Sequence, residues 1–320
     1  MGTYIITGGT GFIGSYIARD LIREGDLVIL YDSSPNRNER SLKAALSEVE
    51  QGKPIIIKGD VLDLEHLMRT IKEYGADVII HMAYILARAS SISPSLAIKV
   101  NCVGTNNIFE AIRLLGLKTK LVWASSCTVF GSPKKHKEEY LPNDAPHYPQ
   151  DIYGASKSFI EHMAEYYFQQ YGIDSIGLRF SPVYGAGMQE GITASLVREL
   201  IENAAIGKPG NVPFGDEVVN WLYVEDAARL LLLAAKVPKT ETRVFSVSGD
   251  LRSVKDAADY VRKLIPDANL SLQPGYWGLC FKYDTSLLEK EIGFKPRFSM
   301  EEGIKEIVNT IRNQTKNKVG

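Results

Sequence analysis

Tyr153 and Lys157 lie four residues apart, and these residue types at this spacing can transfer a proton. Apolar residues recur at helical spacing behind them, which predicts a helix that starts near Tyr153 and carries both side chains on one face. A phenol with a pKa of about 10 is a weak base at neutral pH, but a neighbouring ammonium favours the phenolate. Taken alone, the pair is also typical of a solvated helix surface, so a third group is needed to indicate chemistry.

Ser126 supplies that third group, because it follows a predicted strand over residues 121–124. Its hydroxyl can hydrogen-bond the same substrate oxygen as the Tyr153 hydroxyl. A positioned acid–base residue beside such a hydroxyl can take or give the proton of a carbinol. We predict that Ser126, Tyr153 and Lys157 are the catalytic residues, and that Ser126 and Tyr153 touch the substrate.

A glycine-rich turn at the start of the chain predicts a dinucleotide site. Residues 4–7 are apolar and β-branched, glycines follow, and apolar residues then recur at helical spacing. This order of strand, glycine turn and helix is the context that a dinucleotide fingerprint needs. The helix would open at Phe12 and Ile13, with free amides and a partial positive charge for a pyrophosphate. The glycines that fit the fingerprint are Gly8, Gly9, Gly11 and Gly14. Glycine-rich turns also occur for structural reasons alone.

Asp32 strengthens the dinucleotide prediction. It ends the next predicted strand, over residues 27–31, where an acid can bind the adenosine ribose hydroxyls. Such an acid favours NAD over NADP, and we predict NAD as the cofactor. Arg37 and Arg40 follow closely and could instead meet a 2′-phosphate.

Three further positions follow predicted strands on the rim where this fold places ligands. Asp60 comes after a strand over residues 55–57, and it either lines the rim or caps a helix over residues 64–74. Met82 and Ala83 come after a strand over residues 77–81, and we expect the segment 82–84 to be small where the backbone passes a cofactor. His81, which closes that strand, is interpreted as structural rather than catalytic.

Arg88 is a candidate substrate contact, because it lies in the next loop on the same rim. A guanidinium suits a carboxylate, so Arg88 would favour a sugar acid or hydroxy acid as substrate. The alternative is that Arg88 is a solvated loop residue.

Alternating strands and helices over residues 1–180, without a hairpin signal, position these residues. This order predicts an α/β fold with a Rossmann-type, doubly wound parallel sheet. We assign residues 1–180 to an NAD-binding domain, with a return segment near 216–248. Residues 181–215 and 249–320 would form a smaller C-terminal, substrate-binding lobe. Residues 132–149 are rich in Pro, Lys and Glu, which predicts an exposed loop that we call the excursion.

Composition excludes several other classes of function. The 320 residues are 45% hydrophobic with a net charge of -1 and no basic runs, which disfavours nucleic acid as a partner. No apolar run approaches the roughly 20 residues of a membrane span, and no signal peptide is evident. The three cysteines, at positions 102, 127 and 280, lack paired or metal-ligand spacing, so we expect no metal and a reducing, cytoplasmic location. The expected partner is a small-molecule substrate.

Across essentially its full length the chain resembles the extended short-chain dehydrogenase/reductases, in the NAD-dependent epimerase/dehydratase family. The resemblance rests on these motifs: TGGTGFIG (7–14), GDV (59–61), VNCVGT (100–105), SSCTVFG (125–131), YGASK (153–157) and LRF (178–180). It implies the same catalytic set, Asp60 and Val61 at the adenine, and Lys157 on the nicotinamide ribose. It also implies Pro182 and Val183 near the carboxamide, and a homodimer through helices over residues 97–115 and 156–171. The wide apolar stripe from Phe159 to Tyr171 is consistent with such pairing.

Departures from the family pattern narrow the range of reactions that this chain is expected to catalyse. Dehydratases of the family carry an acid where this chain has Cys127 and Thr128, so elimination is not expected. The threonine at position 128 resembles the pattern of the 4-epimerases, and Thr128 is a candidate substrate contact. Those enzymes, however, hold the nucleotide diphosphate with one arginine in an Arg-Asp-Phe-type motif, which reads Val219-Asn220-Trp221 here, and with a second arginine, where this chain has Gln273.

We therefore favour a dehydrogenase or reductase that acts on a polar, sugar-like or sugar-acid substrate. The alternative is a nucleotide-sugar 4-epimerase resembling UDP-glucose 4-epimerase. A regulator that binds the cofactor without catalysis is disfavoured by the complete catalytic set.

Overall fold

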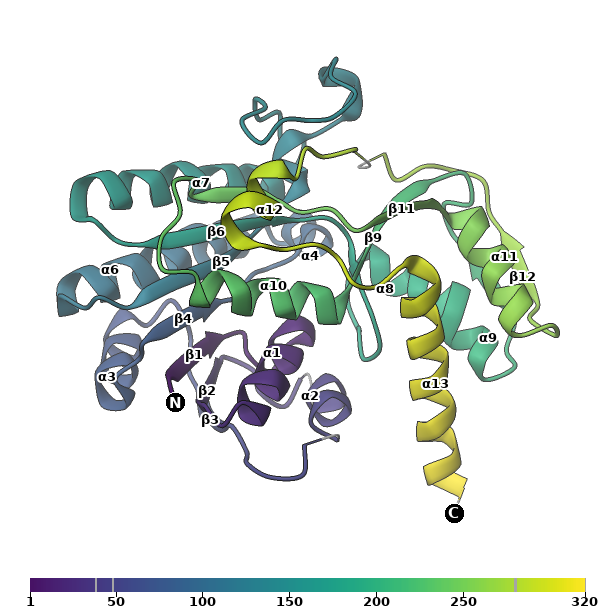
Figure 1. Ribbon diagram of the computed structural model, residues 1–320, viewed down its shortest axis with the longest axis horizontal. Coiled ribbons are helices and arrows are strands. Elements are labelled where there is room, and N and C mark those ends of the chain that lie inside the picture. The colour runs from purple at the N-terminus through teal and green to yellow at the C-terminus, as the bar shows by residue number, and fades with distance from the viewer. Residues whose placement is uncertain (38, 48, 279–280, 320) are drawn as a thin grey trace.

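The computed structural model describes residues 1–37, 39–47, 49–278 and 281–319. A central sheet of seven parallel strands confirms the predicted Rossmann-type fold (Figure 1). The strand order is β10-β6-β5-β4-β1-β2-β3. Its strands are β1 (Thr3–Thr7), β2 (Leu27–Asp32), β3 (Ile55–Lys58), β4 (Val78–His81), β5 (Lys120–Ser126), β6 (Ser175–Phe180) and β10 (Val244–Ser246). The order reverses between β1 and β4, and ligands of such sheets bind at the carboxyl ends of the strands there.

Helices cover both faces of the sheet (Figure 1). On one face lie α1 (Phe12–Arg23), α2 (Glu39–Leu46) and α10 (Val224–Lys236). On the other lie α3 (Leu64–Tyr74), α6 (Thr105–Leu115) and α7 (Ile152–Tyr171). Because both faces are covered, the strands other than the partly exposed edge strand β3 are buried and apolar at nearly every position. Ile6, for example, packs with the α1 and α10 side, whereas Ile5 packs with the α3, α6 and α7 side.

The helix predicted over residues 97–115 is three elements in series. It starts earlier, as α5 (Pro94–Ile98), continues as the π-helix η1 (Lys99–Gly104) and ends as α6. Before it, α4 (Ala87–Ile92) occupies the segment that was predicted to be a loop. Ser93 separates α4 from α5, with Pro94 in the first turn of α5.

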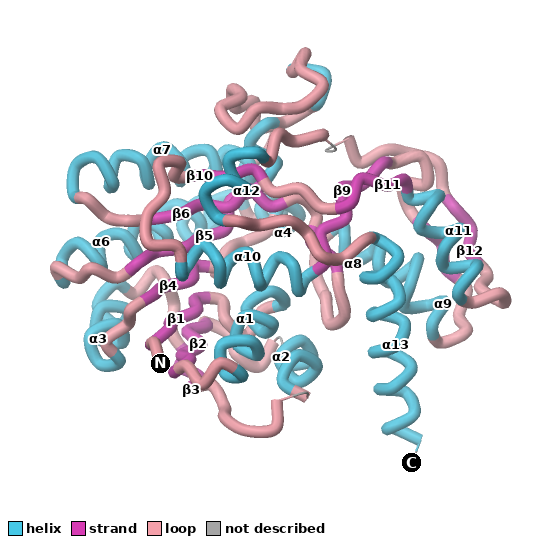
Figure 2. The backbone as a smooth tube through the Cα atoms, in the orientation of Figure 1, coloured by secondary structure: helices cyan, strands magenta, loops and turns pink. Residues whose placement is uncertain are grey.

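The C-terminal part of the chain forms two small sheets and further helices (Figure 2). One sheet contains β7 (Val183–Tyr184), β9 (Val218–Tyr223) and β11 (Asp250–Ser253); the other contains β8 (Gly210–Val212) and β12 (Leu270–Leu272). The helices are α8 (Ile192–Val197), the π-helix η4 (Arg198–Glu202), α9 (Asn203–Ala205), α11 (Val254–Leu264), α12 (Ser286–Ile292) and α13 (Met300–Val319). The segment 216–248 is divided: β9 lies in a small sheet, whereas α10 covers the central sheet and β10 extends it.

The excursion between β5 and α7 is only partly exposed. It opens with two 3-10 turns, η2 (Cys127–Phe130) and η3 (Pro133–Lys135), and residues 137–140 are exposed. Its second half returns to the protein, where Leu141 bridges to Tyr283 and packs with Phe130 and Phe281. This half therefore belongs to the core beside Ser126.

Within the described ranges, no helix is both long enough and apolar enough to cross a bilayer. The same residues contain no group of three or more His, Cys, Asp or Glu side chains that could hold a metal ion. Cys280 lies outside the described residues.

Candidate active site

The glycine turn lies at the carboxyl end of β1 and packs tightly against its neighbours. Gly8 has a φ of 65°, and an added Cβ would lie 2.8 Å from the backbone nitrogen of Ala83. A Cβ on Gly14 would lie 2.7 Å from the carbonyl oxygen of Gly9. Among the described residues no side chain caps α1, and its first turn carries no acid. The amides of Phe12 and Ile13 are therefore suited to a pyrophosphate, and this turn fits a dinucleotide.

Asp32 is held beside this turn at the end of β2. Its carboxylate accepts hydrogen bonds from the Thr10 hydroxyl at 2.7 Å and from the Ser34 amide at 2.9 Å. These bonds fix an acid where the fingerprint expects one for the ribose hydroxyls. The guanidinium of Arg37 pairs with Glu190, and the side chain of Arg40 lies outside the described part of the structure.

Asp60 does not cap the following helix. The N-cap of α3 is Asp63, whose carboxylate accepts from the His66 amide at 2.9 Å. The exposed Asp60 carboxylate accepts from the Leu62 amide at 2.9 Å. The capping alternative for Asp60 is therefore wrong, and the adenine contact of Asp60 and Val61 stays a prediction.

The segment over residues 82–84, which follows β4, is close-packed, but its third residue, Tyr84, has a large ring. Ala83 lies against Gly8, as described above, whereas the Tyr84 ring is 4.6 Å from the His81 ring. His81 is fully buried, with the Thr7 hydroxyl 2.6 Å from Nδ1 and the Thr105 hydroxyl 2.9 Å from Nε2. Burial and the nearby Lys157 lower the pKa of His81 to about 3. His81 is therefore neutral and structural.

Ser126 and Tyr153 meet at the carboxyl end of β5. Tyr153 lies in the first turn of α7, which Asp151 caps by accepting from the Gly154 amide at 2.7 Å. The Ser126 hydroxyl accepts from the Thr128 hydroxyl at 3.0 Å. Burial raises the pKa of Tyr153, and a hydrogen bond with Ser126 opposes that rise. The structure thus brings the predicted hydroxyls of Ser126, Thr128 and Tyr153 together.

Lys157 lies one turn further along α7 and is fully buried. Its Nζ donates to the Ala124 carbonyl at 2.6 Å and is 5.4 Å from the centroid of the Tyr153 ring. Burial lowers the pKa of Lys157 well below its usual value, although Glu161 opposes this shift. Burial thus shifts Tyr153 and Lys157 toward their uncharged forms, opposite to the direction that their types alone predict.

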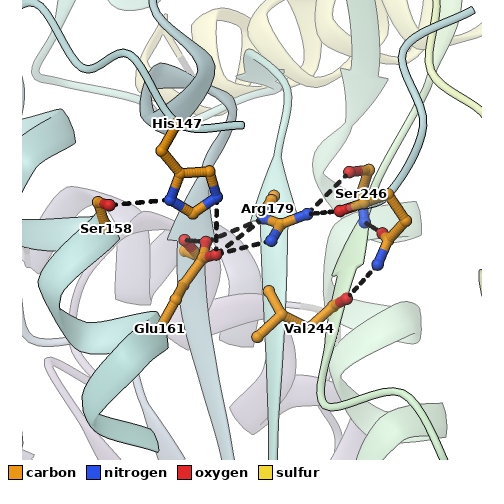
Figure 3. Close-up of polar contacts among 8 residues, drawn as sticks. His147, Ser158, Glu161, Arg179, Val244 and Ser246 are labelled. Atoms are coloured by element: carbon orange, nitrogen blue, oxygen red, sulfur yellow. Dashed lines mark hydrogen bonds and ion pairs between the residues drawn. The ribbon is translucent and has the colours of Figure 1, made fainter. Parts of the chain in front are cut away.

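A cluster of charged and polar side chains joins α7 to β6 (Figure 3). The Arg179 guanidinium, on β6, donates through Nη2 to Glu161 on α7 at 2.7 Å. Glu161 also accepts from the Ser125 hydroxyl at 2.5 Å, and His147 Nε2 lies 3.3 Å from its carboxylate. Ser125 directly precedes Ser126, so this cluster ties the carboxyl end of β5 to α7.

The same cluster anchors the excursion. Arg179 Nη1 donates to the Asn143 carbonyl at 2.5 Å, and the Asn143 side chain accepts from the Ser246 amide and donates to the Val244 carbonyl (Figure 3). Sequence reasoning missed Asn143, His147 and Glu161. The available signals were an acid one helical turn after Lys157 and the arginine within the LRF motif.

A second buried contact joins α7 to the rim. Asn101, in η1, donates through Nδ2 to the Ser156 hydroxyl at 3.2 Å and accepts from the Ile85 amide at 2.8 Å. It therefore fixes the start of the segment that carries Arg88. The Arg88 side chain is exposed on α4. Its contact with substrate stays a prediction.

The remaining predicted residues lie where the C-terminal strands approach the sheet. Pro182 is partly buried and its carbonyl accepts from the Leu222 amide at 3.3 Å, while Val183 is buried in β7. Asn220 is buried in β9, where its amide group contacts Ser248 and the Phe281 carbonyl at 3.0 and 3.3 Å. Asn220 thus holds the C-terminal segments together.

Comparisons with known proteins agree with this geometry. Residues 4–248 match the model of the NAD dependent epimerase/dehydratase family. UDP-glucuronate 4-epimerase 4 of Arabidopsis thaliana is 27% identical over 328 residues, which cover 96% of this chain and 74% of that protein. A putative UDP-glucose 4-epimerase of Methanocaldococcus jannaschii is 28% identical over 324 residues, which cover 98% of this chain and 99% of that protein.

A solved structure shares both fold and cofactor class. The crystal structure of the Thermus thermophilus UDP-glucose 4-epimerase in complex with NAD matches with a TM-score of 0.77 and 26% identity. The match covers 97% of this chain and 99% of that one. A family match of this extent, over a sheet of the predicted topology, shows that the chain belongs to the NAD-dependent epimerase/dehydratase family and is an enzyme that uses NAD.

Proposed function

We propose that this enzyme is a dehydrogenase or reductase that interconverts a carbinol and a ketone in a small, polar, sugar-like or sugar-acid substrate. The observation that carries this choice is the segment Val219-Asn220-Trp221, in which family members that act on nucleotide sugars are expected to carry an arginine for the diphosphate. All three side chains are buried, and none of them is cationic. The Asn220 amide is bonded within the protein, to Ser248 and the Phe281 carbonyl.

Each predicted site residue has a separate role in the proposed reaction. When bound, NAD supplies the hydride acceptor and a positive charge on the oxidised ring. Tyr153 takes the carbinol proton in oxidation and returns it in reduction. The Ser126 hydroxyl orients the substrate oxygen, with Thr128 hydrogen-bonded to it as a further contact. Lys157 supports the Tyr153 phenolate electrostatically and binds the nicotinamide ribose.

Because Tyr153 and Lys157 are buried, the proposed proton transfer requires positive charge near the Tyr153 phenol. Because burial raises the pKa of Tyr153 and lowers that of Lys157, neither group alone provides a phenolate at neutral pH. Each added positive charge near the phenol lowers its pKa, so the oxidised cofactor and the Lys157 ammonium act in the same direction. Proton transfer is thereby coupled to the presence of the oxidised cofactor.

The substrate contacts are assigned to the rim and the C-terminal segments. Residues 181–215 and 249–320 would cover the substrate, with Pro182 and Val183 near the carboxamide of NAD. Arg88 is exposed on α4, where its guanidinium would meet a carboxylate. An anionic substrate would then bind through its own acid group rather than through a diphosphate.

The second candidate function is a nucleotide-sugar 4-epimerase. It is favoured by the named activities of the relatives, which include a UDP-glucuronate 4-epimerase and a putative UDP-glucose 4-epimerase. An epimerase uses the same proton-transfer residues but returns the cofactor to its oxidised form within each turnover. The two candidates therefore differ in whether NADH accumulates.

A substrate panel separates the two candidates. The purified protein is incubated with NAD and with sugars, sugar acids, hydroxy acids or nucleotide sugars, and both NADH absorbance and product isomers are recorded. We expect NADH to accumulate with a sugar acid or hydroxy acid. We expect no such accumulation with the Tyr153→Phe variant. Isomer exchange of a nucleotide sugar without NADH accumulation would establish the epimerase instead.

A further inference from the structure

Lys157 has an aromatic neighbour to which the proposed chemistry gives no role. The centroid of the Tyr84 ring lies 2.8 Å from Lys157 Nζ, compared with 5.4 Å for the ring of Tyr153. Tyr84 comes from the segment after β4, and Tyr153 comes from α7. The ammonium thus lies near two tyrosines of separate elements and is much nearer to Tyr84, which is outside the predicted catalytic set.

Tyr84 is held in place by a rigid neighbour. Its ring packs at 4.6 Å and 57° against His81, whose two nitrogens contact the hydroxyls of Thr7 and Thr105. The Thr105 hydroxyl also donates to the Asn101 carbonyl at 2.5 Å, so His81 Nε2 acts as the donor toward Thr105 and Nδ1 accepts from Thr7. A neutral imidazole therefore supports the Tyr84 ring without repelling the ammonium.

The ammonium needs such a neighbour because it is cut off from water. Lys157 is 0% exposed, and an ammonium in an apolar environment is strongly disfavoured unless it is paired. It has three donors, of which one is directed at the Ala124 carbonyl. The face of an aromatic ring attracts a cation, and most strongly where both are desolvated. Tyr84 presents such a face.

We propose that Tyr84 is a positioning residue, which holds the Lys157 ammonium charged and directed toward Tyr153 through the face of its ring. This proposal rests on the proposed function only in that Lys157 acts together with Tyr153. The other titratable groups near Lys157 are Glu161 and Tyr153 on α7, Cys102 in η1 and His81 on β4. Glu161 is already engaged by Arg179 and Ser125, so Tyr84 is the neighbour whose contact is with the ammonium itself.

The test compares side chains with and without a ring face. Tyr84→Phe keeps the face and removes the hydroxyl, whereas Tyr84→Leu removes the face. Tyr140→Leu is the matched control, because Tyr140 also lies near a lysine ammonium, that of Lys282 at 5.5 Å, but at an exposed site. Folding of each variant is checked by thermal unfolding, and Tyr84→Met replaces Tyr84→Leu if the latter does not fold.

The first readout needs no substrate. Proteins labelled with ¹³C at lysine Cε are titrated by NMR, and the Lys157 signal is assigned by its loss in Lys157→Gln. We expect Tyr84→Leu or Tyr84→Met to lower the pKa of Lys157 by about one unit, and Tyr84→Phe and Tyr140→Leu to leave it within a few tenths. Because this measurement is made without turnover, it stands even if the proposed reaction is wrong.

The second readout is the pH profile of kcat/KM with the best substrate of the panel. When less of Lys157 is charged, the pKa of Tyr153 rises. The rising limb of the kcat/KM profile for substrate oxidation should therefore move to higher pH in Tyr84→Leu and return to its normal pH in Tyr84→Phe. An unchanged pKa of Lys157 in a folded non-aromatic variant would overturn the proposal. So would a Tyr84→Phe variant that titrates like Tyr84→Leu, since the hydroxyl and not the ring face would then be responsible.

Discussion

Tyr153 and Lys157 occupy successive turns of α7, and both face the carboxyl end of β5. Ser126 and Ala124 on that strand provide their hydrogen-bond partners. The proposed function gives Tyr153 the oxygen that exchanges a proton with the substrate, and this hydroxyl is separable from the packing of the ring. The ring can be kept while the chemistry is removed.

Tyr153→Phe should lower kcat by more than about a hundredfold and leave NAD affinity within a few-fold, because only the proton-transfer oxygen is lost. Steady-state kinetics and a fluorescence titration with NAD measure the two effects. Tyr140→Phe, the same change at an exposed tyrosine outside α7, is the control and should have normal turnover. Turnover of Tyr153→Phe near the unaltered level would refute the assigned role.

His81 makes stability depend on pH in a predictable direction. Its pKa of about 3 in the folded protein lies below the unfolded value of about 6.5, so the unfolded state binds the proton more readily between these values. The stability that neutral His81 contributes is therefore fully present above pH 6.5 and is lost as pH falls toward 3. Between pH 7 and pH 5 the loss amounts to about 2 kcal/mol.

Denaturant unfolding at the two pH values measures this loss. The free energy of unfolding should fall by about 2 kcal/mol more in the unaltered protein than in His81→Asn, which has no ring to titrate. If both proteins lose the same amount, His81 does not carry the pH dependence.

Sequence reasoning named the residues whose proposed chemistry follows from local spacing, and it missed those that act through tertiary contacts. Ser126, Tyr153 and Lys157 were predicted because their spacing places them on a strand end and one helix face. Tyr84 was expected to belong to a small-residue passage, although its ring contacts a lysine far along the chain. His147 and Asn143 lay in a segment whose polar composition predicted exposure, yet one half of it packs into the core.

At the scale of elements, the site depends on how the first glycine turn meets the segment after β4. The reversal of strand order between β1 and β4 brings Gly8 and Ala83 together. Gly8 has a positive φ and has backbone atoms within 3 Å of an added Cβ. Gly75, at the C-cap of α3, has nearly the same φ of 63°, but apart from its chain neighbours no atom of the described residues lies within 4 Å of such a Cβ.

These two glycines separate backbone strain from close packing. Gly75→Ala should cost about 1–2 kcal/mol of stability through its left-handed conformation and leave NAD affinity unchanged. Gly8→Ala should cost more and also weaken NAD binding by at least about tenfold, because the turn must move. Thermal unfolding and NAD titration test this difference. Equal effects of the two substitutions on NAD affinity would show that the contact with Ala83 is unimportant.

The elements were predictable where burial on both faces made the strands continuous apolar runs. The strands of the central sheet other than β3 follow that pattern, whereas the edge strand β3 is an apolar run that is mostly exposed. The sequence did not reveal that β9 joins a separate sheet, because an apolar run does not identify its pairing partner. It also did not reveal the π-helix η1, whose residues have ordinary helical periodicity.

At the scale of the whole molecule, apolar side chains remain exposed on the helices that the family resemblance assigns to a dimer. Val103 in η1 and Leu114 on α6 are 47% and 50% exposed, and Phe159 and Tyr166 on α7 are 52% and 55% exposed. η1 and α6 both pack against α7, so these residues belong to one side of the sheet. We infer that this side pairs with a second copy of the chain in a closed two-fold dimer.

Phe159→Asp should therefore convert a dimer into a monomer at micromolar concentration, because it places a charge in the inferred interface. Sedimentation or light scattering measures the mass. Ile206→Asp, at an exposed apolar residue of the C-terminal segments, is the matched control and should remain dimeric. A monomeric mass for the unaltered protein would contradict the inferred dimer.

The fate of the hydrogen on the substrate's carbinol carbon tests the central claim most directly. The best substrate of the panel is prepared with deuterium at that carbon, incubated with NAD, and both cofactor and substrate are analysed by mass spectrometry. The proposed dehydrogenase predicts that deuterium appears in released NADH in a one-to-one ratio with the ketone product. Deuterium that instead remains on an epimerised substrate, without net NADH, would contradict the account and establish the epimerase.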